Sequence, residues 1–173
     1  MGQYFKPVSL DAKEKVVPFG LKLMEHSWLS NNTMKGVERL LSPGNKWHKT
    51  RIVWAGDYMD NGLFVEEDRT LYSVASEFWL EAQLEFDGPD VVYVVNHTKN
   101  TYIDLREVPD VEDAEGWKIH PLSVLTSSGN GRGGGDYRDD DDDNVGSWAG
   151  DVISTEYVEP VGMEKYTAFF IKD

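Results

Sequence analysis

The fold of this chain is decided by the stretch Asp90-Val91-Val92-Tyr93-Val94-Val95-Asn96-His97-Thr98-Lys99-Asn100-Thr101-Tyr102-Ile103-Asp104-Leu105-Arg106. Its two ends are rich in Val, Ile and Tyr, which favour strands, and the polar run Asn96–Asn100 between them favours a turn. The stretch therefore predicts a β-hairpin with strands in residues 90–97 and 101–106.

Further strands are expected on both sides of this hairpin. Residues 51–58 begin Arg-Ile-Val-Trp, which predicts a buried strand. In residues 15–24 the apolar positions are interrupted by Pro18 and Gly20, so a bent pair of strands or a sheet edge is expected there. The remaining predicted strands are residues 3–10, 117–127, 151–158 and 166–172.

Two segments have the apolar spacing of a helix. Asn31 or Asn32 is expected to cap a helix near residues 32–41, which ends before Pro43 and Gly44. Asp68 is expected to cap a second helix near residues 68–84. The apolar stripes are Met34, Val37, Leu40 and Leu41 in the first helix, and Leu71, Ala75, Phe78 and Ala82 in the second.

The order of these elements predicts an α+β fold. About seven or eight strands, mostly consecutive, with about two helices favour a mostly antiparallel or mixed β-sheet with the helices packed on one face. Strands and helices do not alternate regularly, so a doubly wound nucleotide-binding fold is not expected. Residues 1–173 are expected to form a single globular domain, with an irregular Gly- and Asp-rich loop at residues 128–147.

The charge of the chain is strongly negative and unevenly distributed. The formal net charge is −14, and residues 56–115 alone carry three Lys and Arg against sixteen Asp and Glu, a net charge of −13. Direct binding of nucleic acid is disfavoured because phosphates would be repelled. The acidity therefore indicates either a basic protein partner or a simple contribution to solubility.

Cysteine is absent, and this excludes disulfides, thiolate metal ligands and a cysteine nucleophile. No apolar run follows the first residues, and the longest apolar stretches are far shorter than the ~20 residues that span a bilayer. We therefore expect a cytoplasmic protein with no membrane partner.

The most unusual local feature is a glycine-rich loop. Five of the seven residues 129–135 are glycine. Successive backbone N–H groups in such a loop can surround an anion, and Arg132 can add a bidentate contact. The ending Gly-Lys-Ser/Thr of a P-loop is missing, so a flexible surface loop is the alternative.

The run Asp139–Asp143 directly follows this loop. Carboxylate oxygens suit divalent cations, but a specific calcium loop spaces its ligands around a glycine, and this run is unspaced. Weak divalent cation binding is the most that it indicates, and no functional metal site or cofactor is predicted.

A tetrapeptide occurs twice: Trp54-Ala55-Gly56-Asp57 recurs as Trp148-Ala149-Gly150-Asp151. On one interpretation both turns line one ligand site, where the Trp rings stack on a planar ligand and the Asp side chains accept hydrogen bonds. On the other, each is a tight turn whose Trp anchors the core. The candidate ligand-binding residues are Trp54, Asp57, Asn130, Arg132, Gly134, Asp136, Trp148 and Asp151.

Catalysis is not predicted, although it is not excluded. The four histidines form no His-Glu-x-x-His pair, and no serine lies in a Gly-x-Ser-x-Gly elbow. Carboxylates are too numerous for an acid and base pair to be singled out.

Several motifs together resemble an uncharacterised family of small bacterial and bacteriophage proteins. They are Gly2-Gln3-Tyr4-Phe5-Lys6-Pro7-Val8-Ser9-Leu10-Asp11, Gly20-Leu21-Lys22-Leu23-Met24-Glu25-His26, Arg51-Ile52-Val53-Trp54-Ala55-Gly56-Asp57-Tyr58, and Asn130-Gly131-Arg132-Gly133-Gly134-Gly135-Asp136 followed by Val145-Gly146-Ser147-Trp148-Ala149-Gly150-Asp151. The family has no established activity, so no catalytic residue is carried over. The resemblance implies a phage context inside a bacterial host cell, where small acidic proteins commonly bind and block host machinery.

These observations favour a non-enzymatic acidic interaction protein, in the form of a phage-type inhibitor of a host defence complex such as a CRISPR effector. It would occupy the basic nucleic-acid groove of that complex. The candidate partner-binding residues are Glu66, Glu67, Asp68, Glu77, Glu81 and Glu85. The alternative is a small-ligand or nucleotide-binding protein, or an enzyme, that uses the glycine-rich loop and the two Trp-Ala-Gly-Asp turns.

Overall fold

The hairpin expected from residues 90–106 is present in the computed structural model of the chain, which describes residues 4–17, 29–58, 63–66, 68–110, 115–128 and 144–167. Strand β5 (Tyr93–Asn96) pairs antiparallel with β6 (Thr101–Asp104). The Oδ1 atom of Asn96 accepts hydrogen bonds from the backbone N–H groups of Thr98 and Lys99, both at 2.9 Å. The Asn96 side chain thus closes the turn of the predicted hairpin.

The other elements follow in chain order. The strands are β1 (Phe5–Ser9), β2 (Glu14–Lys15), β3 (Thr50–Gly56), β4 (Leu80–Glu81), β7 (Ser127–Ser128), β8 (Val152–Glu156) and β9 (Glu164–Lys165). The helices are α2 (Asn32–Leu40), α3 (Leu71–Phe78) and α4 (Pro121–Leu125), with a 3₁₀ turn η1 (Leu105–Glu107) after β6.

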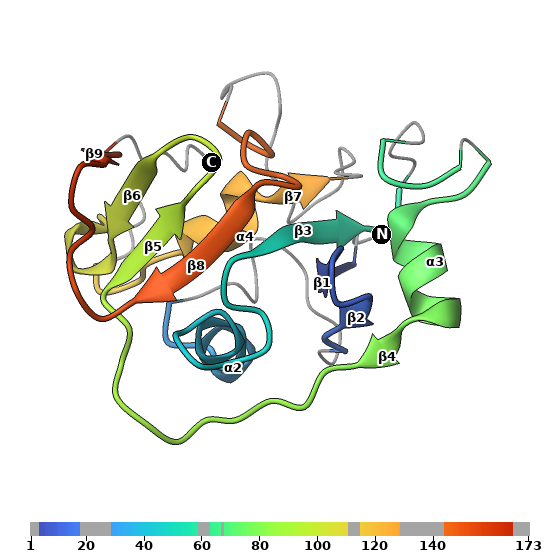
Figure 1. Ribbon diagram of the computed structural model, residues 1–173, viewed down its shortest axis with the longest axis horizontal. Helices are drawn as coiled ribbons and strands as arrows, with labels where there is room; N and C mark the ends of the chain where they lie inside the picture. Colours follow the sequence, from blue (N-terminus) through green and yellow to red (C-terminus); the bar gives the residue numbers. More distant parts are fainter. Residues whose placement is uncertain are drawn as a thin grey trace.

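Among the described residues, nine strands form one mixed sheet, in the order β4-β2-β1-β3-β8-β5-β6-β9 with β7 beside β3 (Figure 1). Strand β3 joins the two parts of this sheet. It pairs along its length with β1, at its start with β8 through Thr50 and Ile153, and near its end with β7 through Trp54 and Ser127. The predicted α+β class and mixed sheet are confirmed.

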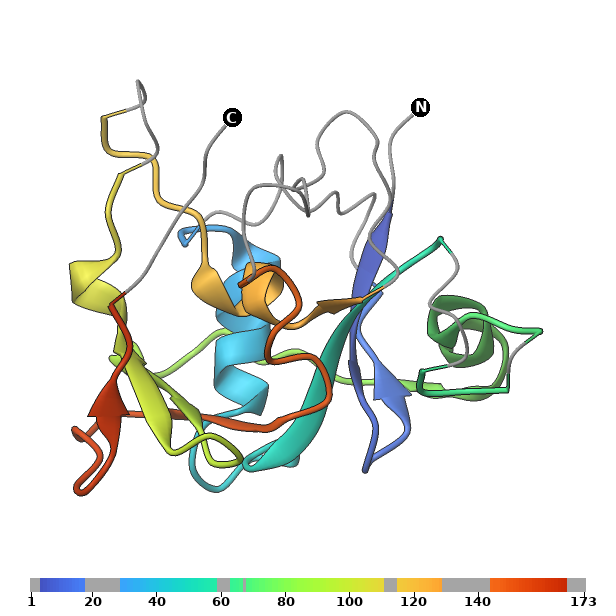
Figure 2. The same cartoon turned by 90° about the horizontal axis from the view of Figure 1, so that it is seen from above.

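The helices cover both faces of the sheet, so the prediction that they pack on one face was wrong. Alternate residues of a strand point to opposite faces. Ile52 and Trp54 belong to the main core with α2 and α4, whereas Val53 and Ala55 pack against Leu71 and other residues of α3. Figures 1 and 2 show α2 beside α4, and α3 apart from them near β1 and β2.

Helix α2 begins where it was predicted. The Asn31 side chain accepts hydrogen bonds from the backbone N–H groups of Thr33 at 2.8 Å and Met34 at 3.4 Å, which satisfies two of the donors at the helix start. Buried residues Met34 and Val37 fix the helix on the main core.

Helix α3 differs at both ends from the predicted helix near residues 68–84. Thr70, and not Asp68, caps it, because the Thr70 Oγ1 atom accepts from the backbone N–H of Ser73 at 3.1 Å. The helix ends at Phe78 because the following residues pair with β2, and the Ala82 N–H donates to the Lys15 carbonyl at 2.8 Å. Sheet pairing thus overrides the helical spacing of this segment.

Helix α4 lies in residues 117–127, where the sequence predicted a strand. Its cap is His120, whose Nδ1 atom accepts from the backbone N–H of Leu122 at 3.1 Å, and Pro121 occupies the first helical position. The Nε2 atom of His120 then carries the proton and donates to the Oε1 atom of Glu38 on α2 at 2.8 Å. Both side chains are buried, so this pair fastens α4 to α2 inside the core.

Candidate functional site

The two Trp-Ala-Gly-Asp segments lie side by side. Only the second is a turn, because Trp54, Ala55 and Gly56 belong to strand β3, so the prediction of a turn was wrong for the first segment. The Trp54 N–H donates to the Thr126 carbonyl at 2.8 Å, and the Trp148 N–H donates to the neighbouring Leu125 carbonyl at 2.7 Å. Gly150 also donates to Ile52 of β3 at 2.9 Å. Both tryptophans belong to the main core, with exposed fractions of 0% and 2%, so their rings face packed side chains and not an open site.

The two aspartates of these segments have separate partners. Asp57 and Tyr4 exchange hydrogen bonds where β1 and β3 begin to separate: Asp57 N–H to the Tyr4 carbonyl at 3.1 Å, and Tyr4 N–H to Asp57 Oδ1 at 3.3 Å. Asp151 accepts from Asn96 Nδ2 at 2.8 Å and forms an ion pair with Lys99. The carbonyl of Asp151 accepts from the N–H of Ile52. Ile52 precedes Asp57 by five residues, which is a distance of roughly 16 Å along a strand, so the two aspartates are not adjacent.

The other predicted ligand-binding residues are Asn130, Arg132, Gly134 and Asp136, and they lie outside the described residues, as does the run Asp139–Asp143. An anion-binding loop at these positions therefore stays a prediction.

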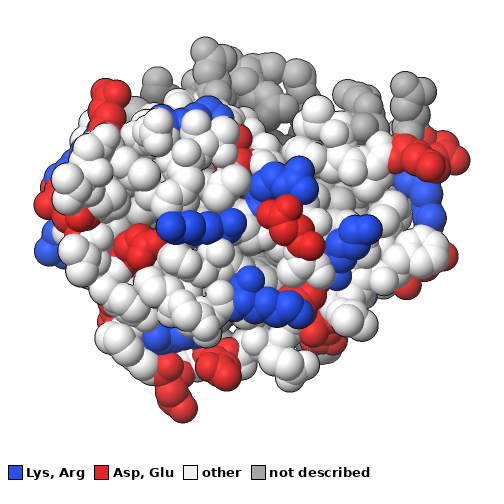
Figure 3. Space-filling view, viewed as in Figure 1, with Lys and Arg blue, Asp and Glu red and all other residues white. Residues whose placement is uncertain are grey.

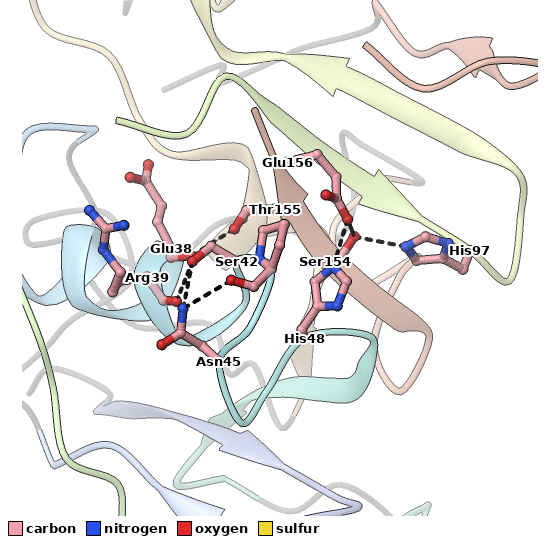
Figure 4. A network of polar contacts seen from close by, with 10 residues as sticks. Glu38, Arg39, Ser42, Asn45, His48, His97, Ser154, Thr155 and Glu156 are labelled. Carbon is pink, nitrogen blue, oxygen red and sulfur yellow. Dashed lines mark hydrogen bonds and ion pairs between the residues drawn. The ribbon is translucent and has the colours of Figure 1, made fainter. Parts of the chain in front are cut away.

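A polar network that the sequence did not reveal lies on one face of β8 (Figure 4). The Oε1 atom of Glu156 accepts from Ser154 Oγ at 2.7 Å and contacts His48 Nε2 at 2.8 Å. Because the Ser154 hydroxyl proton goes to Glu156, the Nε2 atom of His97 is the donor to Ser154 Oγ, at 2.7 Å. Its members come from positions 48 to 156, and only the alternation of Ser154 and Glu156 on one strand hinted at it.

This network does not have the geometry of a serine hydrolase. In a catalytic triad the carboxylate orients the histidine, whereas here Glu156 accepts from the serine itself. Ser154 is fully buried, which keeps its hydroxyl from a substrate. The pKa of His97 is lowered from its ordinary value of 6.5 by burial and by the nearby charge of Lys49, which favours the neutral ring.

No cluster of three or more His, Asp or Glu residues in the described ranges has the geometry to hold a metal ion. The described part of the chain likewise contains no helix that is long and apolar enough to cross a membrane.

The most distinctive exposed surface is a segment that we name the acidic–apolar strip, residues 77–87. It runs from the end of α3 through the edge strand β4 into an extended segment that passes below α2 in the view of Figure 1. Large apolar side chains are exposed along it: Phe78 at 61%, Leu80 at 73% and Phe86 at 58%. Three predicted partner-binding carboxylates, Glu77, Glu81 and Glu85, are exposed in the same segment.

Burial alternates along the second half of the strip. Ala82 is buried and Leu84 packs against the main core, whereas the neighbouring residues Glu81, Gln83 and Glu85 are exposed. Ala82 and Leu84 thus anchor the segment to the body of the protein, and the glutamates are presented to solvent.

The carboxylates of the strip differ in their partners. Glu77 forms an ion pair with Arg69, whose guanidinium also lies 4.9 Å from the centre of the Phe78 ring. Glu81 and Glu85 have no cationic partner in the described part of the chain. The nearby Lys15 is already engaged, since its Nζ atom donates to the Ser76 carbonyl at 2.7 Å.

The remaining predicted partner-binding residues precede α3. Glu66 and Asp68 are exposed, and Glu67 lies outside the described residues. On the face seen in Figure 3, Asp and Glu are interspersed with Lys and Arg. The excess of negative charge in residues 56–115 therefore does not form one unbroken acidic area on that face.

Searches against protein-family models, curated proteins and solved structures give no match to this chain.

Proposed function

We propose that this chain is a non-enzymatic interaction protein whose acidic–apolar strip binds a basic surface of a partner protein. The observation that carries the proposal is the exposure of Phe78, Leu80 and Phe86 beside Glu81 and Glu85, two carboxylates without cationic partners in the described residues. Exposed aromatic and aliphatic side chains supply the buried anchors of an interface, and unpaired charges supply electrostatic complementarity.

The partner that fits this chemistry presents Lys and Arg next to apolar surface. The nucleic-acid groove of a protein complex has this character, because it must neutralise phosphates and stack bases. Among complexes with such a groove, we propose a host defence complex such as a CRISPR effector, because the resemblance to small bacteriophage proteins implies that context. The chain would compete with nucleic acid for that groove.

The polar network around His97 supports a non-enzymatic role. Its serine is buried and its histidine is a donor, so the network stabilises the pairing of β8 with its neighbours and offers no activated nucleophile.

A labelled peptide of alternating Lys and Leu residues serves as the probe for the strip. Fluorescence anisotropy would follow its binding to the intact chain and to the variant Leu80→Ser/Phe86→Ser, and to the variant Glu81→Gln/Glu85→Gln. We expect at least tenfold weaker binding for each variant, and a steep loss of affinity as salt rises from about 0.05 M to about 0.5 M.

The opposite edge of the sheet offers a matched control. Val161 is 97% exposed and Glu164 is exposed on β9, so Val161→Ser/Glu164→Gln removes the same two kinds of group elsewhere. Equal losses in the control and the strip variants, or binding that is indifferent to salt, would refute the proposal.

A second assay tests the partner class. A purified RNA-guided effector with its guide is titrated with target DNA at several concentrations of the chain. Competition for the groove predicts that the apparent Kd for DNA rises with the concentration of the chain and that an excess of DNA restores full binding. Inhibition that excess DNA does not overcome would contradict competition.

A further inference from the structure

The acidic–apolar strip contains the sequence pattern of a strand that is longer than β4. Apolar and polar side chains alternate strictly in Leu80-Glu81-Ala82-Gln83-Leu84-Glu85-Phe86-Asp87. Alternation with a period of two is typical of a β-strand, because successive side chains point to opposite sides of an extended backbone. Only the first two of these residues form β4, and the rest belong to no strand of the described sheet.

The backbone of this continuation is open. No hydrogen bond joins the backbone of residues 83–87 to another residue that the structure describes. Figure 1 shows the segment as it passes below α2, with no labelled element beneath it in that view. Unpaired N–H and C=O groups along an extended segment are a template for pairing with another chain.

The pairing of β4 with β2 defines which edge is free. The Ala82 N–H donates to the Lys15 carbonyl at 2.8 Å, so Ala82 directs its backbone groups toward β2. Neighbouring residues of a strand direct their N–H and C=O groups to opposite edges. Glu81, Gln83 and Glu85 therefore direct theirs away from β2, toward the edge where the sheet order ends.

The side chains along this segment specify the strand that can pair with it. Residues directly opposite on adjacent strands lie roughly 5 Å apart, so their charge and polarity have to match. Glu81 and Glu85 have no cationic partner among the described residues, and Leu80 and Phe86 are exposed. A complementary strand places Lys or Arg beside the glutamates and apolar residues beside Leu80 and Phe86.

We infer that residues 80–87 are a docking edge for an extended segment of the partner protein in which Lys or Arg alternates with apolar residues. The partner segment joins the sheet as an additional strand beside β4, and its backbone pairs with the open groups of Gln83 and Glu85. Main-chain hydrogen bonds then supply affinity, and the alternating side chains supply specificity. The inference rests on the proposed function, since it states how the strip holds its partner.

Gln83→Pro tests the backbone contact, because proline has no N–H and is tolerated at a strand edge. Its matched control is Gln83→Ala, which loses the same side chain and keeps the N–H. We follow the binding of the labelled peptide of alternating Lys and Leu by fluorescence anisotropy. Gln83→Pro should bind it about tenfold more weakly than Gln83→Ala does. Thermal unfolding shows whether both variants are folded.

Two N-methylated forms of the peptide test the same contact without any change in the chain. One form carries methyl groups on the Lys amides and the other on the Leu amides, so each blocks one edge of the extended peptide. Pairing through a single edge predicts that one form binds about tenfold more weakly than the unmethylated peptide. The other form should bind almost as well as the unmethylated peptide.

Equal affinities of the two methylated forms would overturn strand addition, as would equal affinities of folded Gln83→Pro and Gln83→Ala. The proposed function survives that result if Leu80→Ser/Phe86→Ser and Glu81→Gln/Glu85→Gln still weaken the binding of the unmethylated peptide. An unmethylated peptide that does not bind the intact chain would overturn the proposed function and strand addition together.

Discussion

The side chain of Leu84 lies 3.1 Å from the position that a β-carbon on Gly36 would occupy. Gly36 stands in the middle of α2, where glycine costs about 1 kcal/mol of helix stability relative to alanine. The missing side chain lets Leu84 approach the helix, and Leu84 holds the acidic–apolar strip against the core. Glycine at position 36 therefore allows the strip to lie close against α2.

Gly36→Ala should therefore depend on Leu84. With Leu84 present, the gain in helix propensity is opposed by the close contact, whereas in Leu84→Ala the contact is absent. We expect Gly36→Ala to be more stabilising by about 1 kcal/mol in the Leu84→Ala background. Urea unfolding of the four proteins measures this coupling, and strictly additive effects would contradict the close approach.

The buried pair of Glu38 and His120 should be sensitive to the loss of its acceptor. Glu38→Leu leaves the His120 Nε2–H group buried without a partner and should lower the free energy of unfolding by about 3 kcal/mol. Glu38→Gln retains an acceptor oxygen and should cost about 1 kcal/mol. Chemical unfolding measures the free energy of unfolding of both variants. Equal losses in Glu38→Leu and Glu38→Gln would mean that the hydrogen bond between α2 and α4 is unimportant.

Trp47 and Trp54 provide a comparison of two buried indoles. Trp47 donates to Glu14 Oε2 at 2.8 Å, while the Nε1 atom of Trp54 has no acceptor among the described residues. Both Phe substitutions remove similar volume, but only Trp47→Phe also breaks a bond to a buried carboxylate. Trp47→Phe should be the more destabilising by about 1–2 kcal/mol in thermal or urea unfolding. A larger loss for Trp54→Phe would count against this account.

His97 should contribute to the pH dependence of stability. Burial, followed by repulsion from Lys49, lowers the pKa of His97 below 6.5, with His48 adding to this and Glu156 opposing it. The unfolded chain therefore takes up this proton at a higher pH than the folded chain. The free energy of unfolding should fall as the pH drops through about 6.5 and level off below the folded pKa.

His97→Gln removes the titrating group while it keeps a donor for Ser154. Its free energy of unfolding should change less between about pH 8 and about pH 6 than that of the original chain. Parallel pH profiles for the two proteins would show that His97 is not responsible.

The parts of the fold that the sequence predicted depend on local signals. The hairpin around Asn96 and helix α2 after Asn31 could be predicted because a turn or cap residue stands beside a regular apolar pattern. Helix α4 could not, because it has only five residues and its cap is a histidine. The end of α3 could not either, since pairing of β4 with β2 depends on residues far away in the chain.

In the candidate sites, too, the features with a local sequence signal could be predicted, and those that depend on distant residues could not. The glutamates of the strip could be named from charge alone, but the apolar side chains between them became significant only through their exposure. The repeated tetrapeptide was visible in the sequence, yet the burial of Trp54 and Trp148 in one core depends on the pairing of distant strands.

The central place of β3 has a consequence for synthesis on the ribosome. Its partner β8 pairs Ile153 with Thr50, about a hundred residues earlier in the chain. At a translation rate of roughly 5–20 residues per second, the nascent β3 waits about 5–20 seconds for that partner. During this interval β1 can cover one edge of β3, while the other stays open to wrong pairing. Cellular yield should therefore depend on chaperones that shield nascent chains.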